Sequence, residues 1–248
     1  TALTGERLLA GVLGFKLVLI GCHLLNTALI DRIAAGTGLA RPGVAALAYG
    51  WNPFILYETA GNGHNDIVML TGLLLALWLL LVRRRAALAL PVATLALLAK
   101  YVAGLWLPVL LLGWVWPGIR RGEWWRERRW LPPFLSCLCC ALLIVAGFAP
   151  FWAGGHALDG VRRQADLYTT SLASWLIALL IERRLVIGVA ALLDLIKRCA
   201  MLILALTILL ARPRSGDARG LVNALFDVSL VYLLFGALWF QPWYLVPL

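Results

Sequence analysis

Long uninterrupted apolar segments are the feature that most constrains the fold of this chain. A bilayer crossing needs about 20 mostly apolar residues, and such runs recur along the whole sequence. The composition agrees, because 62% of the 248 residues are hydrophobic and only 14% are charged. A single soluble core cannot hide that much apolar surface. These features exclude a soluble enzyme, a disordered chain and a disulfide scaffold, and they predict an all-α integral membrane protein.

The charges between the apolar runs predict the number of crossings. Two basic clusters, 83–85 and 120–129, flank the apolar stretch 86–116, and the positive-inside rule places both clusters on the cytoplasmic side. The stretch between them must then cross an even number of times, so we divide it at Lys100. We therefore expect about eight transmembrane helices, at 8–30, 44–60, 67–82, 86–99, 101–116, 134–151, 195–211 and 221–240.

The same rule orients the chain in its membrane as one polytopic domain, 1–248. The loops 31–43, 83–85, 118–130 and 212–220 carry most of the basic residues and are expected inside. The segments 61–66, 152–194 and 241–248 are expected outside, together with Lys100. Residues 171–181 are apolar but too short to span, so we expect an outward-facing interfacial helix there. The net charge of +10 is then a topology signal, and the expected surroundings are membrane lipids rather than nucleic acid.

The densest polar cluster follows one of the expected spans. The turn 61–66 presents His64 and Asp66 between two apolar runs, and these side chains can accept or relay a proton. Asp66 also stands where a carboxylate caps a helix, so helix capping is the alternative interpretation. Glu58 lies inside the preceding apolar run, and a carboxylate at membrane depth indicates a functional site. We predict His64, Asp66 and Glu58 as catalytic residues, with Asn62 and Asn65 binding substrate.

Lone cations on the same outer side complete the candidate site. Lys100 stands at the tip of the 86–116 hairpin, where it can offer a point charge to a phosphate or extend its amine to the interface. Arg162 and Arg163 lie in the outer segment. Gln241, Trp243 and Tyr244 form a polar and aromatic run that suits a sugar or lipid headgroup, although an aromatic belt at the interface explains the same residues.

Three of these segments resemble one family. The residues WNP at 51–53 and GNGHND at 61–66 resemble a conserved block of the polyprenyl-phosphate-dependent glycosyltransferases of the GT-C superfamily, especially the bacterial mannosyltransferase-like group. LAKY at 98–101 followed by LPVLL at 107–111 is similar to that superfamily's lysine-containing hairpin. FQPWYL at 240–245 resembles its late W-Y-L segment. Together these motifs cover most of the chain in the expected order.

The resemblance implies transfer of a hexose, mannose in that group, from a polyprenyl-phosphate donor to a glycan or glycolipid acceptor outside the plasma membrane. In such enzymes the general base is an acidic residue in the first outer loop. We therefore expect this chain to be a fragment that begins after that loop, with the general base upstream of Thr1. The single histidine of the candidate site and its few carboxylates are compatible with Mg²⁺ or Mn²⁺ but do not demand either ion. The alternative is a membrane transporter or a flippase for lipid-linked sugars, which would place broken helices near the bilayer midplane.

Overall fold

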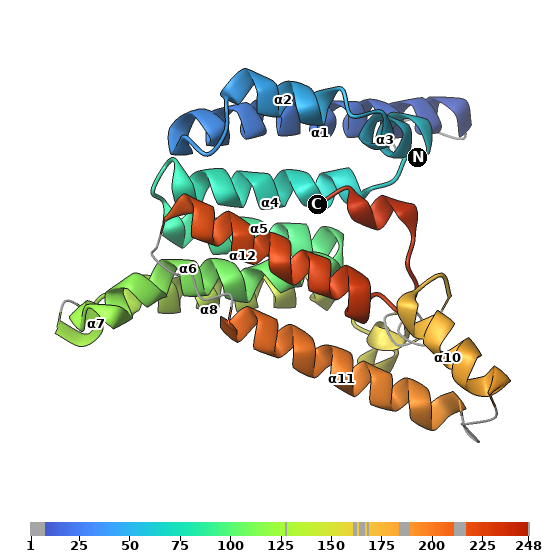
Figure 1. Cartoon of the computed structure of the whole chain (residues 1–248). Helices are drawn as coiled ribbons and strands as arrows, with labels where there is room; N and C mark the ends of the chain where they lie inside the picture. Colours follow the sequence, from blue (N-terminus) through green and yellow to red (C-terminus); the bar gives the residue numbers. More distant parts are fainter. Residues whose placement is uncertain are drawn as a thin grey trace.

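The computed structural model of the chain describes residues 8–126, 128–160, 163, 167, 169–183, 189–210 and 217–247. Every regular element in these residues is helical, so the all-α prediction is confirmed. Figure 1 shows α1 (Leu8–Thr37) along one side of the molecule, with α4 (Asp66–Leu81) and α5 (Ala86–Ala99) beneath it. The chain then continues through the following elements: η2 (Tyr101–Leu105), α6 (Trp106–Arg120), α7 (Glu123–Arg126), α8 (Leu131–Phe148), η3 (Ala149–Phe151), η4 (Gly154–Leu158), α10 (Leu172–Glu182), α11 (Val189–Leu210), α12 (Ala218–Val231), η5 (Tyr232–Gly236) and η6 (Pro242–Leu245).

Four helices of the described chain are long and apolar enough to cross a membrane. They are Leu8–Thr37, Tyr101–Arg120, Leu131–Phe151 and Ala218–Gly236, and the bent pair Pro53–Gly61 and Asp66–Leu81 adds a fifth if it counts as one span. The prediction of about eight spans is therefore not confirmed. Ala86–Ala99 is shorter than a crossing needs, and α11 carries Asp194, Lys197 and Arg198 along its length.

The expected helix at 44–60 is broken, which corrects the prediction for that segment. The structure divides it into α2 (Pro42–Gly50), α3 (Pro53–Leu56) and a π-helical turn, η1 (Tyr57–Gly61). Pro53 cannot donate a backbone hydrogen bond into a continuous helix, and the Asn52 side chain instead accepts from the amides of Phe54 and Ile55 to start α3. The π-turn then ends at the predicted turn 61–66, and α4 leaves it bent by 120°.

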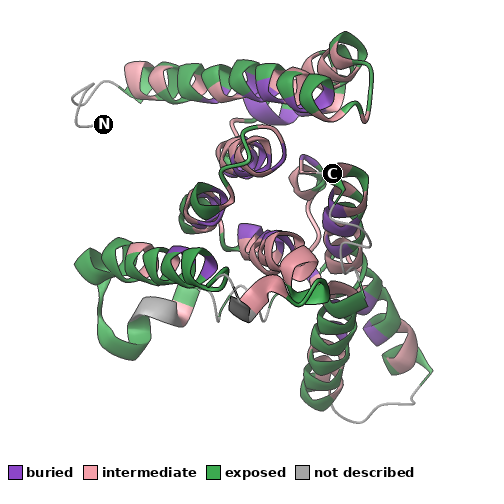
Figure 2. Cartoon of the chain, turned by 90° about the vertical axis from the view of Figure 1, so that its left-hand side faces the viewer, coloured by how far each residue is buried: buried purple, intermediate pink, exposed green. Residues whose placement is uncertain are grey.

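The exterior of the bundle suits a lipid environment. In Figure 2 the buried residues gather where neighbouring helices face one another, whereas the outer faces of the long helices are exposed. Only 6% of the apolar segment within Leu131–Phe151 is buried inside the protein. Its exposed apolar side chains are therefore suited to contact with lipid. This agrees with the prediction of a membrane protein.

Polar side chains attach α2 and α4 to α1. His23 Nε2 lies 3.0 Å from the carbonyl oxygen of Gly50, and the His23 ring stacks on Tyr49. One turn further along α1, the Asn26 amide donates to the Tyr49 hydroxyl at 3.1 Å and to the Ile67 carbonyl at 3.4 Å. Lipid is as apolar as the helix surfaces, so hydrophobic burial does little to bring helices together inside a membrane. Hydrogen bonds between helices therefore help to fix their relative positions.

The closest approach of α4 and α5 leads to a prediction about stability. A Cβ added to Gly72 would lie 2.8 Å from the Cβ of Ala96, which is buried. We expect Gly72→Val to lower the free energy of unfolding by about 1–3 kcal/mol through overpacking. Unfolding of the detergent-solubilised protein with denaturant measures this change. The exchange variant G72A/A96G keeps the summed volume and should be close to the wild type; equal losses in both variants would contradict this packing.

The outward-facing segment predicted at 171–181 is confirmed as a helix, α10, and its interfacial placement stays a prediction. Ser171 caps α10 through a reciprocal pair of hydrogen bonds with Ser174. Just before it, the Thr170 hydroxyl donates to the Phe240 carbonyl and the Phe240 amide donates to the Thr169 carbonyl. These bonds join α10 to the C-terminal segment that carries Trp243.

Candidate functional site

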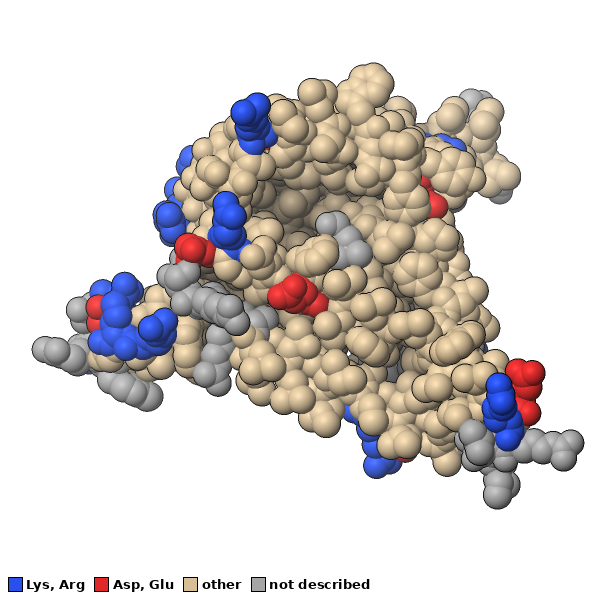
Figure 3. All heavy atoms as spheres, in the orientation of Figure 1, with Lys and Arg blue, Asp and Glu red and all other residues tan. Residues whose placement is uncertain are grey.

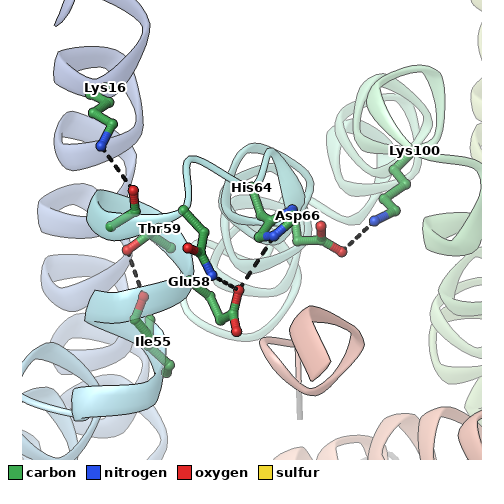
Figure 4. Close-up of polar contacts among 9 residues, drawn as sticks. Lys16, Ile55, Glu58, Thr59, His64, Asp66 and Lys100 are labelled. Atoms are coloured by element: carbon green, nitrogen blue, oxygen red, sulfur yellow. Dashed lines mark hydrogen bonds and ion pairs between the residues drawn. The ribbon is translucent and has the colours of Figure 1, made fainter. Parts of the chain in front are cut away.

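Glu58 and His64 lie together at one end of the bundle, in the turn between η1 and α4. The Glu58 side chain is buried, and its Oε2 atom accepts from the Asn62 amide at 3.0 Å and lies 3.4 Å from His64 Nε2. The backbone folds back at the same place, because the His64 amide donates to the Glu58 carbonyl at 3.0 Å. Gly63 permits this turn with φ at +78°, a value that favours glycine. Figure 4 shows the resulting cluster.

Lys16 of α1 anchors this turn from the other side. Its Nζ atom donates to the Gly61 carbonyl at 2.8 Å (Figure 4). Gly61 is the last residue of η1, where a helical carbonyl lacks its usual partner. A charged donor in that position stabilises the negative end of the short helix, so Lys16 supports the loop that carries His64.

Asp66 forms a buried ion pair with Lys100 rather than a helix cap. Its Oδ1 atom lies 2.6 Å from Lys100 Nζ, and the two side chains are 3% and 17% exposed. Asn65 is the N-cap residue of α4, and no side chain supplies a cap hydrogen bond there. Lys100 ends α5, as the hairpin prediction required, and its amine is turned inward instead of extending to solvent. Within the described residues, Asp66 Oδ2 is buried and has no hydrogen-bond partner.

Two aromatic residues from the C-terminal segment close over both pairs. The Trp243 ring stacks on the His64 imidazole with centroids 3.8 Å apart and planes 22° apart. The neighbouring Tyr244 ring lies 4.9 Å from Lys100 Nζ, which is a cation–π distance. Four segments remote in sequence thus converge on one site: α1, the stretch from η1 to the start of α4, the end of α5, and η6.

A small cavity lies beneath Asp66 and Lys100. Its wall includes Trp106, Ser229, Tyr232 and Tyr244, and the Trp106 indole donates to the Ser229 hydroxyl at 3.0 Å. Trp106, Ser229 and Tyr232 are not among the site residues predicted from the sequence. One signal was present: Ser229 and Tyr232 stand three residues apart, hence on one face of an apolar helix, in the last predicted span.

A larger apolar groove adjoins this cavity on the α11 side. Leu105, Tyr232 and Tyr244 line both spaces. The remaining wall of the groove is mostly aliphatic and aromatic, from Tyr101, Ala200, Met201, Leu204, Leu238 and Trp239, with Lys197 as the charged member. The Lys100–Asp66 pair therefore lines a cavity whose wall is shared with an apolar groove.

Not every predicted site residue joins the cluster. Arg162 lies outside the described residues. Arg163 is exposed, and within the described chain no hydrogen bond or ion pair links it to the cluster. Asn65 is exposed on the turn, and Gln241 precedes η6 with its carbonyl accepting from the Tyr244 amide. The roles of these four residues stay predictions.

The electrostatics of the cluster do not favour a divalent cation. Glu58 is occupied by His64 and Asn62, and the ammonium of Lys100 already neutralises Asp66. Among the residues that the structure describes, no three His, Cys, Asp or Glu side chains gather as metal ligands. The residues present do not fit Mg²⁺ or Mn²⁺, and we derive no step through a metal.

Comparisons with known proteins find sequence similarity to mannosyltransferases. Residues 1–117 match the family described as "Alpha-(1->6)-mannopyranosyltransferase, N-terminal domain". Alpha-(1->6)-mannopyranosyltransferase A of Mycobacterium tuberculosis (strain ATCC 25618 / H37Rv) is 29% identical over 161 residues, which are 65% of this chain. The match spans only 30% of that relative's length. No solved structure matches the chain.

These matches support the resemblance to mannosyltransferases, and residues 1–117 include the GNGHND and LAKY segments, whereas the resemblance of FQPWYL at 240–245 stays a prediction. The matched residues 1–117 contain η1, the turn with His64 and Asp66, and the end of α5 with Lys100. In its first 117 residues the chain is similar to the N-terminal domain of the alpha-(1->6)-mannopyranosyltransferases, and several of its helices are apolar enough to span a membrane.

Proposed function

We propose that this chain is part of a GT-C-type glycosyltransferase that moves mannose from a polyprenyl-phosphate donor to a glycan or glycolipid acceptor. The observation that carries the proposal is the convergence of two carboxylates, His64 and Lys100 at one end of the bundle, beside an apolar groove. The similarity to mannosyltransferases supports the sugar. A donor that joins a phosphate to a long hydrocarbon chain matches a cation at the end of such a groove.

Lys100 is the group we assign to the donor phosphate. An ammonium has three N–H donors, and only one of them is directed at Asp66. Asp66 and the Tyr244 ring hold the amine in place, so it can donate a second hydrogen bond to a phosphate oxygen in the adjoining cavity. Because Asp66 already balances its charge, Lys100 orients the phosphate more than it neutralises it.

His64 is the group we assign to the acceptor side. Glu58 fixes the imidazole from below and Trp243 covers its face, which leaves a positioned ring that can relay the proton of an acceptor hydroxyl. The acceptor oxygen then forms its bond to the anomeric carbon while the bond from that carbon to the phosphate oxygen breaks. The electron pair leaves with polyprenyl phosphate, and one displacement inverts the anomeric carbon.

The location of the site supports an outer-face reaction. Figure 3 shows Lys and Arg gathered toward the end of the molecule where α7, the α4–α5 turn and the start of α12 lie. His64, Asp66 and Lys100 lie at the opposite end, at the starts of α4 and η2. By the positive-inside rule the basic end is expected on the cytoplasmic side, and this supports a site on the outer side of the plasma membrane.

The donor class can be tested directly with membranes that contain the intact protein. We expect label from polyprenyl-phosphate [³H]mannose to enter the acceptor, and no label from a nucleotide mannose when polyprenyl-phosphate mannose synthesis is absent. A donor with a short prenyl chain should have a KM at least about tenfold higher, because it buries less hydrocarbon in the groove. Membranes from the host without the protein are the blank. Direct use of the nucleotide sugar would overturn the proposal.

One observation favours a transporter or flippase as the second candidate. The segment η1–α4 is broken and bent by 120°, and discontinuous helices form the substrate sites of many transporters. Reconstituted vesicles separate the two functions. Movement of a lipid-linked sugar between leaflets without glycosidic bond formation would support the transporter and contradict the transferase.

A further inference from the structure

A second cavity lies at the basic end of the molecule, remote from the candidate site. Its lining comes from the end of α4, the α4–α5 turn, the last turns of α6 and the start of α12. Leu80, Leu81 and Leu221 form apolar walls, Trp114 and Pro117 contribute from α6, and Arg84 and Asp217 are its charged members. This cavity has no role in the proposed transfer reaction.

The backbone of Arg84 singles it out within this cavity. The amides of Val82 and Arg83 both donate to the Trp78 carbonyl, and the Arg85 amide donates to the Leu79 carbonyl, so α4 ends in a tight turn. Arg84 occupies that turn with φ at +56°, a left-handed conformation in which glycine is the usual residue. Its side chain is exposed, and within the described chain it makes no hydrogen bond or ion pair. A strained, unpartnered cation facing a cavity indicates a ligand.

The charges around Arg84 favour an anion. Arg83 and Arg85 flank it, and Arg83 is held over the Trp78 ring at 5.3 Å. Arg85 precedes α5 without a side-chain cap, so the positive end of α5 also faces this region. Asp217 is the opposing charge, but its Oδ1 atom accepts from the Gly220 amide at 2.6 Å and caps α12. Its carboxylate is thereby turned toward a helix N-terminus.

We propose that this cavity binds the phosphate headgroup of an anionic phospholipid, with Arg84 as its main contact. Leu80, Leu81 and Leu221 form the apolar part of the lining beside the charged rim, and this combination suits the glycerol end of the same lipid molecule. Basic pockets between membrane helices at the cytoplasmic side recognise anionic lipid headgroups in this way. The proposal does not depend on the transferase function, because it rests on a different cavity and different residues.

The test uses a matched pair of arginines. Arg128 lies at the same basic end, is exposed and also has a positive φ of +49°, but it does not line the cavity. The intact protein, its R84Q variant and its R128Q variant would be placed in nanodiscs of phosphatidylcholine with increasing phosphatidylglycerol. Native mass spectrometry counts the retained phosphatidylglycerol molecules, and a spin-labelled phosphatidylglycerol reports their affinity.

We expect R84Q to lose one retained phosphatidylglycerol and to weaken binding about fivefold, the effect of one basic residue near an anionic surface. R84K should keep the bound lipid, and R128Q should match the wild type. Equal losses in R84Q and R128Q would show general surface attraction and overturn the proposal. Equal retention of phosphatidylcholine, or displacement of the lipid by millimolar inorganic phosphate, would also overturn it.

Discussion

Replacing Lys100 by methionine is expected to lower the free energy of unfolding by about 3–5 kcal/mol, because it leaves the buried Asp66 carboxylate without its charge partner. The Asp66 side chain is only 3% exposed and its second oxygen already has no partner among the described residues, so water cannot replace the lost ammonium without opening the site. Equilibrium unfolding in detergent micelles measures the loss.

The double variant D66N/K100M is the control for this prediction. It removes both charges and keeps two side chains of similar size, so most of the stability should return while transfer activity remains absent. Recovery of stability without recovery of activity separates the structural role of the pair from its role toward the donor phosphate. If the single K100M variant is as stable as the wild type, the ion pair between Lys100 and Asp66 does not contribute to the stability of the solubilised protein, and the prediction is wrong.

Removing the proton-relaying ring is expected to have the largest effect on activity. Under the proposed function, His64→Phe should lower kcat by about 10²–10⁴-fold, the usual contribution of a positioned acid or base. Phenylalanine retains a flat ring that can stack on Trp243, so the fold should survive. Glu58→Gln should lower kcat in the same direction by a smaller factor, since a glutamine can still accept from Asn62 but no longer stabilises a protonated imidazole.

Transfer of labelled mannose in membranes, with thermal unfolding as the parallel measurement, tests the His64 and Glu58 variants together. Glu123→Gln is the matched control, because Glu123 is a carboxylate at the opposite end that pairs with Arg121 and Arg129. It should leave transfer unchanged. If His64→Phe transfers mannose at the wild-type rate, the acceptor role of His64 is wrong, whatever the stability of the variant.

Many of the helices could be predicted from the sequence, because a chain that inserts into a membrane has a clear pattern of long apolar runs separated by charged residues. Apolar runs separated by arginines predicted helices that the structure contains, and a lone Lys100 between two runs predicted the turn between α5 and η2. The break at Asn52 and Pro53 was readable as a helix start, yet the apolar residues around it outweighed that signal. The number of spans is not confirmed, because hydropathy alone does not distinguish a full crossing from a shorter apolar helix such as α5.

Pairing within the site could not be read from the sequence. Asp66 stands at the first position of α4, where both a cap and an ion pair are chemically reasonable. Only the packing of α5 beside α4 decides between them, by bringing Lys100 to 2.6 Å. Likewise, the aromatic run at 240–245 suits any membrane interface, and its specific contacts with His64 and Lys100 depend on where the chain returns after α12.

The order in which the site is assembled follows from where its parts lie along the chain. Lys100 and Asp66 are joined by a local hairpin, so their ion pair can form as soon as α4 and α5 have left the ribosome and entered the bilayer. Trp243 and Tyr244 are synthesised more than half a chain length after Lys100, and loop closure makes such distant contacts the slow ones. Until they arrive, the His64 ring has no cover. A truncated or stalled chain would therefore insert and hold its charges, but it would present an open and unfinished site.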